Sequence, residues 1–479
     1  MFPIAALAAL IVFGAPANEG RLHADFRTEA ERFRGTCMFQ LTKVPGCAAL
    51  LLTDHPLHVA VGSIAPQNGF GVGGAVVTHF TPSENWRISW NSDAVGALAS
   101  GAWRAGTYLK IIATPIEPPR PVAHASASAV AGLSDFEHPI ITAYGQAISL
   151  PTVFFFGLGP DSLHADQTAF GFSEGIVGAT GTLPLFRKSR AQSLKLTAVA
   201  ELNERIPSVR SGTSTTVSSI ESKYTNIDAP GLDKQPATTQ FGEGLRARPS
   251  FFNDHLALDY LVNWQQFVAT DSAYSFRRWS VDLKHEIRLY GTSFPGAYQT
   301  NGPNECAPDP KGDCFGDLKR AFSKDCQADP SCPQSHNRVG TVLIRGWVSR
   351  ASTARDSAVP FYFQQTLGGS DINGARTLAG YEDYRFRGTG VVLAQASLEH
   401  SLGKWPVGLF VEGDEGSVAL PSQDLWSLRM RGSAAVGLNI RAGGFPAFTV
   451  AYAKGSEGHH AIYVLSTALL GGSARPSLQ

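Results

Sequence analysis

The sequence has few charged residues and no excess of either sign. Charged residues make up 17% of its 479 positions, and 40 basic side chains balance 40 acidic ones. Proteins that bind nucleic acid concentrate positive charge on one face, so this balance gives no support for a nucleic-acid partner. Beyond the N-terminus no run of about 18 apolar residues occurs, which excludes a membrane-crossing helix there.

Signatures of catalysis and cofactor binding are also scarce. The sequence has no His-Glu-x-x-His motif, and we expect no nucleophile elbow, no metal and no cofactor. Gly69, Gly71 and Gly74 match a dinucleotide fingerprint, but the residues after them predict a strand, not a helix that would face a phosphate. We therefore expect no enzyme; a Ser, His and Asp that converge from separate strands are the alternative left open.

The first residues have the composition of an export signal. An apolar core at 2–13 precedes Ala15-Pro16-Ala17, a small-x-small cleavage pattern. This pattern predicts a signal peptide over residues 1–17. A short segment over residues 18–56 follows, with a helix expected at 24–34.

Six cysteines fit an exported protein, because disulfides persist outside the cytosol. Their spacings are wider than the gaps of about two to four residues that zinc sites favour. We expect disulfides that staple a surface loop, and the sequence leaves their pairing open. The candidates are Cys37, Cys47, Cys306, Cys314, Cys326 and Cys332.

Alternating apolar and polar side chains predict strands from residue 57 onward. In the run 193–203, for example, Leu196 and Leu202 alternate with Lys195 and Glu201. Similar runs lie at 68–80, 85–97, 102–114, 138–150, 255–265 and 278–289, and a less clear one at 57–64 or 122–131. Polar segments at 207–240 and 291–337 are expected to be loops.

These runs fit either a soluble sandwich or a membrane barrel. They reach the length of about 9–11 residues that crosses a bilayer, whereas soluble strands usually have about 5–6. We therefore expect the apolar side of each strand to face lipid and the charged side to face a lumen.

The stretch 361–388 interrupts the strand pattern. It contains the pair Gly368-Gly369, then Gly380, two tyrosines, and the arginines Arg385 and Arg387. Glycine permits positive φ and close backbone approach. A long irregular segment in a compact domain is usually functional, so this stretch is the main candidate site.

This stretch resembles the inward-folded loop of the bacterial surface antigen superfamily, the BamA/TamA-like outer-membrane barrels. The family pattern is a Gly-Gly pair, then Leu-Arg-Gly-Tyr/Phe, then Arg-Phe-Arg. The corresponding residues here are Gly368-Gly369, Leu378-Ala379-Gly380-Tyr381 and Arg385-Phe386-Arg387.

One position departs from the family pattern. Ala379 replaces an arginine that, in the family, pairs with an aspartate of a later strand, and the matching residue here is the barrel-wall Asp414. Arg376, Arg385 or Arg387 would have to substitute. The resemblance implies that Arg385 and Arg387 face the lumen and pair with wall acids, for which the candidates are Glu399, Glu412 and Asp414.

The resemblance implies an all-β fold, a transmembrane antiparallel β-barrel of about 16 strands with the Gly-rich inward loop before the last five. The five runs after the loop are 391–402, 406–420, 426–441, 445–454 and 460–469. The barrel is expected over 57–470, with a tail at 471–479. Residues 18–56 are too few for the periplasmic POTRA modules that precede the barrel in the best-known relatives.

The resemblance also implies a location and a role. The protein is expected in the cell outer membrane, in contact with outer-membrane lipid, where it assists insertion or translocation of client proteins without catalysis. Two alternatives remain open, a passive channel with a polar lumen and a surface-exposed structural antigen.

Overall fold

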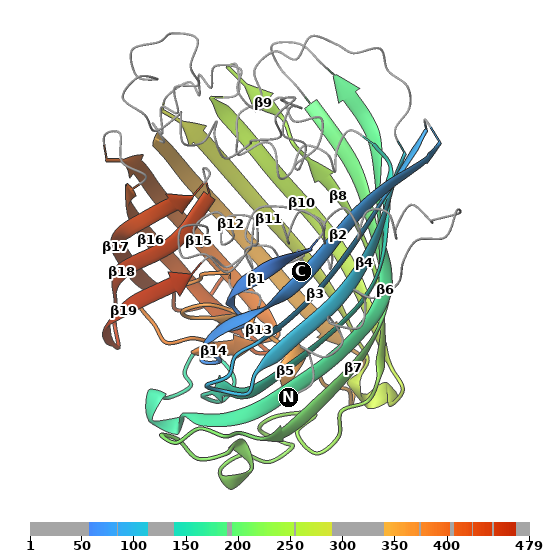
Figure 1. Ribbon diagram of the computed structural model, residues 1–479. Coiled ribbons are helices and arrows are strands. Elements are labelled where there is room, and N and C mark those ends of the chain that lie inside the picture. The colour runs from blue at the N-terminus through green and yellow to red at the C-terminus, as the bar shows by residue number, and fades with distance from the viewer. Residues whose placement is uncertain are drawn as a thin grey trace, which may run out of the picture.

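A computed structural model describes residues 57–83, 85–113, 138–188, 194–252, 255–289, 340–372, 375–402, 407–423, 425–442 and 445–465. Nearly all regular structure in these residues is β, in one large antiparallel sheet (Figure 1). Among them, none of the helical turns has the length and apolar character of a membrane-crossing helix.

The sheet has seventeen strands, all paired antiparallel. They are β1 (Leu57–Ser63), β2 (Phe70–Ser83), β3 (Trp86–Gly96), β4 (Trp103–Ala113), β5 (Ile140–Phe155), β6 (Thr168–Lys188), β7 (Leu194–Ser211), β8 (Thr238–Ala247), β9 (Ser250–Phe251), β10 (Leu256–Ala269), β11 (Phe276–Arg288), β12 (Gly340–Thr353), β15 (Gly390–Ser401), β16 (Val407–Ala419), β17 (Arg431–Ala442), β18 (Phe445–Gly455) and β19 (Gly458–Leu465).

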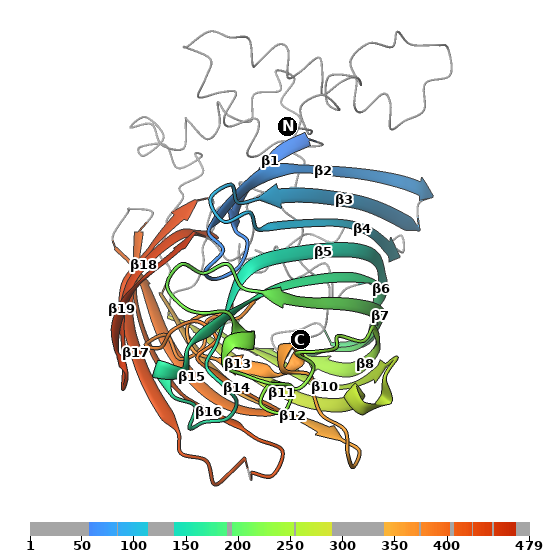
Figure 2. The same cartoon turned by 90° about the horizontal axis from the view of Figure 1, so that it is seen from below.

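Apart from β8 and β9, which both pair with β10, each strand of this sheet pairs with the sheet strand that follows it along the chain, and the sheet curls into a barrel wall (Figure 2). The two-residue β9 continues β8 along the same edge of β10, so sixteen wall strands remain. β19 approaches β1. In the described residues no ladder of paired residues joins these two strands, so the sheet stays open at that seam.

The inner and outer faces of the wall differ in polarity. On β16, Glu412 and Asp414 point inward and are buried, whereas Leu409 and Val411 point outward and are 40% and 49% exposed. Successive residues of a strand point to opposite faces, so Glu412 and Asp414, which are two positions apart, both lie on the inner face. The same arrangement recurs on β7, where Glu201 is 1% exposed and Leu202 56%. The predicted assignment of apolar sides outward and charged sides inward holds for these residues, whereas Glu415 on β16 and Glu243 on β8 are exposed charges on the outward face.

Because successive strands run in opposite directions, every second connection lies at the same end of the barrel. The connections β5–β6, β7–β8, β12–β15 and β18–β19 emerge at one end, which is the lower end in Figure 1. The β12–β15 connection contains the small sheet of β13 (Gln365–Leu367) and β14 (Phe386–Gly388). Five strands follow this connection, as predicted.

Some predicted boundaries are wrong. The run 426–441 enters the sheet only at Arg431, because residues 420–430 belong to the β16–β17 connection. The segment 207–240 is not all loop, because β7 continues to Ser211. Pro207, which has no N–H to donate, lies beyond Arg205, where the ladder to β8 ends.

The sequence allowed one strand to lie at either of two positions, and the structure has it at the first, as β1 (Leu57–Ser63). The alternative position at 122–131, the signal peptide, the helix at 24–34, all six cysteines and the C-terminal tail lie outside the described residues. Their predicted roles remain predictions.

Candidate functional site

The candidate site is the segment 361–388, called the inward loop below. It starts with the 3₁₀ turn η7 (Phe361–Phe363), and its hairpin of β13 and β14 closes through Gly368 and Gly369, which have φ of +108° and +55°. A Cβ on Gly368 would lie 2.6 Å from the Glu382 carbonyl oxygen, so only glycine fits this turn. The segment predicted to lack regular structure therefore contains a short hairpin.

The first docking contact is made at Ala379. Its backbone N–H donates to Asp414 Oδ2 at 3.0 Å, and its methyl packs against Ala435 and Ala453. Asp414 also accepts from Gln395 Nε2 at 3.0 Å and from Ser433 Oγ at 3.1 Å. The wall aspartate Asp414 therefore faces position 379, where it accepts from a backbone N–H.

Gly380 and Tyr381 continue this docking onto the last hairpin. A Cβ on Gly380 would overlap the carbonyl carbon and oxygen of Lys454 in β18. The Tyr381 hydroxyl shares a hydrogen bond of 2.8 Å with Ser456 Oγ in the β18–β19 turn. The loop backbone therefore lies directly on the backbone of the strand pair that ends the described sheet.

Arg385 makes four hydrogen bonds from the loop. Its guanidinium is bidentate to Glu457, with Nε–Oε2 and Nη2–Oε1 distances of 2.7 Å. It also donates to Ser162 Oγ and O at 3.0 and 2.7 Å, and it stacks on Phe156 and Phe386. Arg385 is 1% exposed. One buried side chain therefore ties the β5–β6 turn to the β18–β19 turn across the barrel.

Arg387 has a different environment. Its Nη1 donates to the Phe361 carbonyl at 2.8 Å, and its guanidinium carbon lies about 6 Å from the rings of Phe155, Phe170 and Phe361. Among the described residues no carboxylate forms an ion pair with it. Burial lowers the pKa of Arg387 to about 10, so the side chain remains charged at neutral pH.

The acid contacts of the loop differ from those expected. Arg376, not Arg385 or Arg387, pairs with Glu412, with Nη2–Oε2 at 3.1 Å. The carboxylates that Arg376 and Arg385 contact among the described residues are Glu412 and Glu457, not Glu399. Glu382 of the loop contacts His164 and Gln167 at 3.1 and 2.8 Å, and Asp383 accepts from Gln67.

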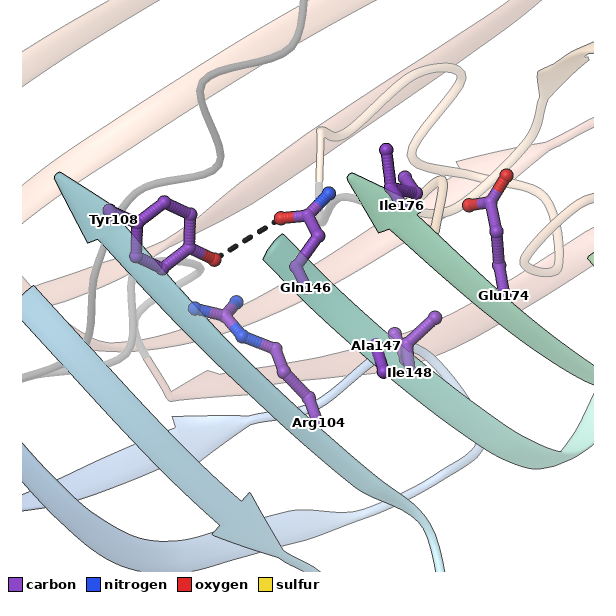
Figure 3. A pocket seen from close by; sticks show the side chains of 7 residues that line it. All are labelled: Arg104, Tyr108, Gln146, Ala147, Ile148, Glu174 and Ile176. Atoms are coloured by element: carbon purple, nitrogen blue, oxygen red, sulfur yellow. Dashed lines mark hydrogen bonds between the residues drawn. The ribbon is translucent and has the colours of Figure 1, made fainter. Parts of the chain in front are cut away.

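The wall that faces the loop is polar. On β4, β5 and β6, Arg104, Tyr108, Gln146 and Glu174 surround a small hollow, and Tyr108 donates to Gln146 Oε1 at 3.1 Å (Figure 3). Farther round, Glu201 accepts from Tyr144 and Asn203 at 2.7 Å. Two ion pairs lie within this wall, Arg205 with Glu174 at 3.1 Å and Arg104 with Asp93 at 3.5 Å.

The described residues were compared with the metal and nucleotide motifs considered in the sequence. No group of three metal-ligating side chains comes together in them. Residues 171–175 match Gly-x-Ser-x-Gly by sequence, contrary to expectation, but they lie inside β6 and not at a strand–helix elbow. Gly71 and Gly74 lie inside β2, as their strand prediction required.

Comparison with known proteins gives only distant similarities. No protein-family model and no curated protein sequence matches the chain. CdiB from Escherichia coli aligns with a TM-score of 0.47 and 11% identity over 86% of this chain and 60% of its own. CdiB from Acinetobacter baumannii gives 0.43 and 9% over 83% and 55%. BamA from Haemophilus ducreyi lacking POTRA domains 1-3 gives 0.44 and 10% over 85% and 69%.

The chain therefore spans less than two thirds of either CdiB protein. Scores and identities this low transfer neither an activity nor a partner. The class that the structure itself defines is an all-β protein whose curled antiparallel wall holds an inward loop.

The sequence did not indicate that Ser162 and Glu457 are partners of the loop. Ser162 and Glu457 are separated from Arg385 by 223 and 72 positions. A lone Ser or Glu in a turn is common, and nothing local marks it as an arginine partner. Only the meeting of the two turns at one end of the barrel brings them together.

Proposed function

We propose that the protein is an outer-membrane β-barrel of the surface antigen type that assists insertion or translocation of other proteins. The observation that carries the membrane part is the inverted polarity of the wall. Outward side chains such as Leu202, Phe241 and Val411 are 46% to 56% exposed, while Glu201 and Asp414 are buried inside. In water this pattern would expose the apolar face to solvent, whereas in a bilayer the same face contacts hydrocarbon.

The layout proposed for the whole chain follows the sequence. A signal peptide at 1–17 directs export, 18–56 forms a short N-terminal segment, 57–470 forms the barrel and 471–479 a tail. The six cysteines then lie in an oxidising compartment and form disulfides.

Val411→Arg tests the lipid-facing assignment. A charge on this outward position of β16 would lie in hydrocarbon, which costs about 2–4 kcal/mol for arginine near the bilayer midplane. We expect less folded protein in the membrane fraction, measured as protease-resistant, membrane-associated protein after expression. Glu415→Arg is the matched control, because Glu415 is an exposed residue on the same strand that already carries charge. Equal membrane levels of both variants would contradict the assignment.

The proposed mechanism is non-catalytic and uses the seam. β1 and β19 approach each other without a ladder in the described residues, so separating them costs few backbone hydrogen bonds. The inward loop contacts the β18–β19 hairpin through Tyr381 and Arg385 and thereby holds one side of that seam. A client strand would enter between β1 and β19 by strand addition.

Depletion of the protein tests the assembly role. We expect the abundance of other outer-membrane barrels to fall, as measured by quantitative proteomics of the outer-membrane fraction. Restoring expression of the unaltered chain should restore them. Unchanged barrel levels would reject the role. In that case, conductance of the purified protein in planar bilayers would support the passive channel, and surface cleavage on intact cells without conductance would support the structural antigen.

A further inference from the structure

The inward loop and the β5–β6 wall enclose a cavity of about 60 Å³ beside Arg387. A bound water needs about 10–15 Å³ of such space, so the cavity has room for about four non-hydrogen atoms. Its lining includes Arg387, Tyr362 and Gln364 of the loop region together with Val153, Phe170 and Ile372.

Two donors that face this cavity have no acceptor in the described part of the protein. Arg387 Nε and the Tyr362 hydroxyl are buried and have no hydrogen-bond partner in the described structure. Arg387 is 4% exposed. Two buried donors without acceptors are costly, because each has lost its hydrogen bonds to water.

The charge balance indicates the sign of a ligand. Arg376 and Arg385 of the same loop each pair with a carboxylate, but Arg387 has none among the described residues, and none of the residues that line the cavity is acidic. A buried cation requires compensation. One guanidinium with no second cation balances one negative charge, which favours a monovalent anion.

We propose that this cavity is a binding site for a short-chain carboxylate of formate or acetate size. The carboxylate accepts from Arg387 Nε and from Tyr362, and the hydrocarbon end contacts Val153, Phe170 and Ile372. These apolar walls match a methyl group better than the hydration shell of an inorganic ion. The side-chain oxygen of Gln364 is also unpartnered; beside formate, which has three non-hydrogen atoms, the cavity keeps room for one water that donates to this oxygen.

The ligand has a route into the cavity. Tyr362, Thr366 and Ile372 line it and remain partly exposed, so the cavity opens toward the lumen through them. The carboxylate has two possible sources of the same chemistry, a free small acid or the C-terminal carboxylate of a polypeptide in the lumen. The proposed site depends only on Arg387 and the cavity, and not on the assembly role.

Saturation-transfer NMR on the methyl protons of acetate tests the site, with the purified full chain in deuterated detergent micelles. We expect transfer in the presence of the protein and none with micelles alone. Arg387→Met is expected to weaken acetate binding about tenfold or more, because it removes a charge-assisted hydrogen bond and the countercharge. Thermal unfolding of the same samples checks that this variant is folded.

Ile372→Phe is the second variant, because it fills the cavity and leaves Arg387 in place. We expect it to abolish acetate transfer without lowering the unfolding midpoint. Displacement of acetate by a dipeptide with a free C-terminus, but not by its amide, would identify a polypeptide end as the source, and no displacement by either would identify a free acid. Absence of transfer, transfer unchanged in both variants, or displacement by chloride at equal concentration would overturn the proposal.

Discussion

Arg385→Met is expected to lower the free energy of unfolding by about 3 kcal/mol, and Glu457→Met by at least as much. Arg385 is 1% exposed, while the Glu457 side chain keeps 24% exposure. Loss of the arginine leaves a carboxylate that water can reach. Loss of the glutamate instead leaves a buried guanidinium without its countercharge, which is the costlier state.

A double-mutant cycle separates this ion pair from its surroundings. We expect the Arg385→Met/Glu457→Met double variant to be less destabilised than the sum of the two single variants, with a coupling of about 1–3 kcal/mol. Urea-induced unfolding in detergent micelles, followed by tryptophan fluorescence, measures all four proteins. Additive single effects would show that the contact contributes no energy of its own.

The control for this cycle is an exposed ion pair at the same end of the barrel. Lys234 pairs with Asp271 at 2.7 Å, and its side chain is 64% exposed. Solvent-exposed pairs contribute about 0–1 kcal/mol. Lys234→Met is therefore expected to change the unfolding free energy by no more than about 1 kcal/mol.

Gly380→Ala is expected to displace the inward loop from the wall. The new Cβ would overlap the backbone carbonyl of Lys454, and a strand backbone cannot rotate away as a side chain can. Relief of this overlap requires the loop to lift, with loss of the Ala379–Asp414 and Tyr381–Ser456 hydrogen bonds. We expect a loss of about 2–4 kcal/mol of stability and faster cleavage within residues 361–388 in limited proteolysis.

Gly413→Ala is the matched control on β16. A Cβ at Gly413 would meet nothing within 4 Å. Stability and the cleavage rate of the inward loop should then stay close to those of the unaltered chain. If Gly380→Ala behaved like this control, the close contact between the loop and β18 would not be what holds the loop in place.

Both experiments test how the inward loop is held against the barrel wall. The loop contacts the last hairpin at Lys454, Ser456 and Glu457, and it contacts the β5–β6 turn at Ser162. A displaced loop would free the β18–β19 turn while leaving the strand ladders intact. If the seam is the route of client entry, Gly380→Ala and Arg385→Met should change the assembly of other barrels before they unfold the wall.

The sequence was most informative where one physical rule acts on neighbouring residues. Alternation along β7 and β16 placed Leu202 and Val411 outside and Glu201 and Asp414 inside, because successive side chains of a strand must point to opposite faces. Alternation was less informative at strand ends. Residues 426–430 continue the pattern but lie outside β17, because the ladder to β16 begins only at Arg431.

For the inward loop, the sequence indicated the segment but not its contacts. Its glycines and arginines marked a special segment, since closely spaced glycines and arginines need a reason to interrupt a run of strands. The pairing of Arg385 with Glu457, of Arg376 with Glu412, and of Asp414 with a backbone N–H was decided only in three dimensions. An ion pair forms between groups that the fold brings close together in space. The spacing of residues along the chain therefore cannot predict which carboxylate pairs with which guanidinium.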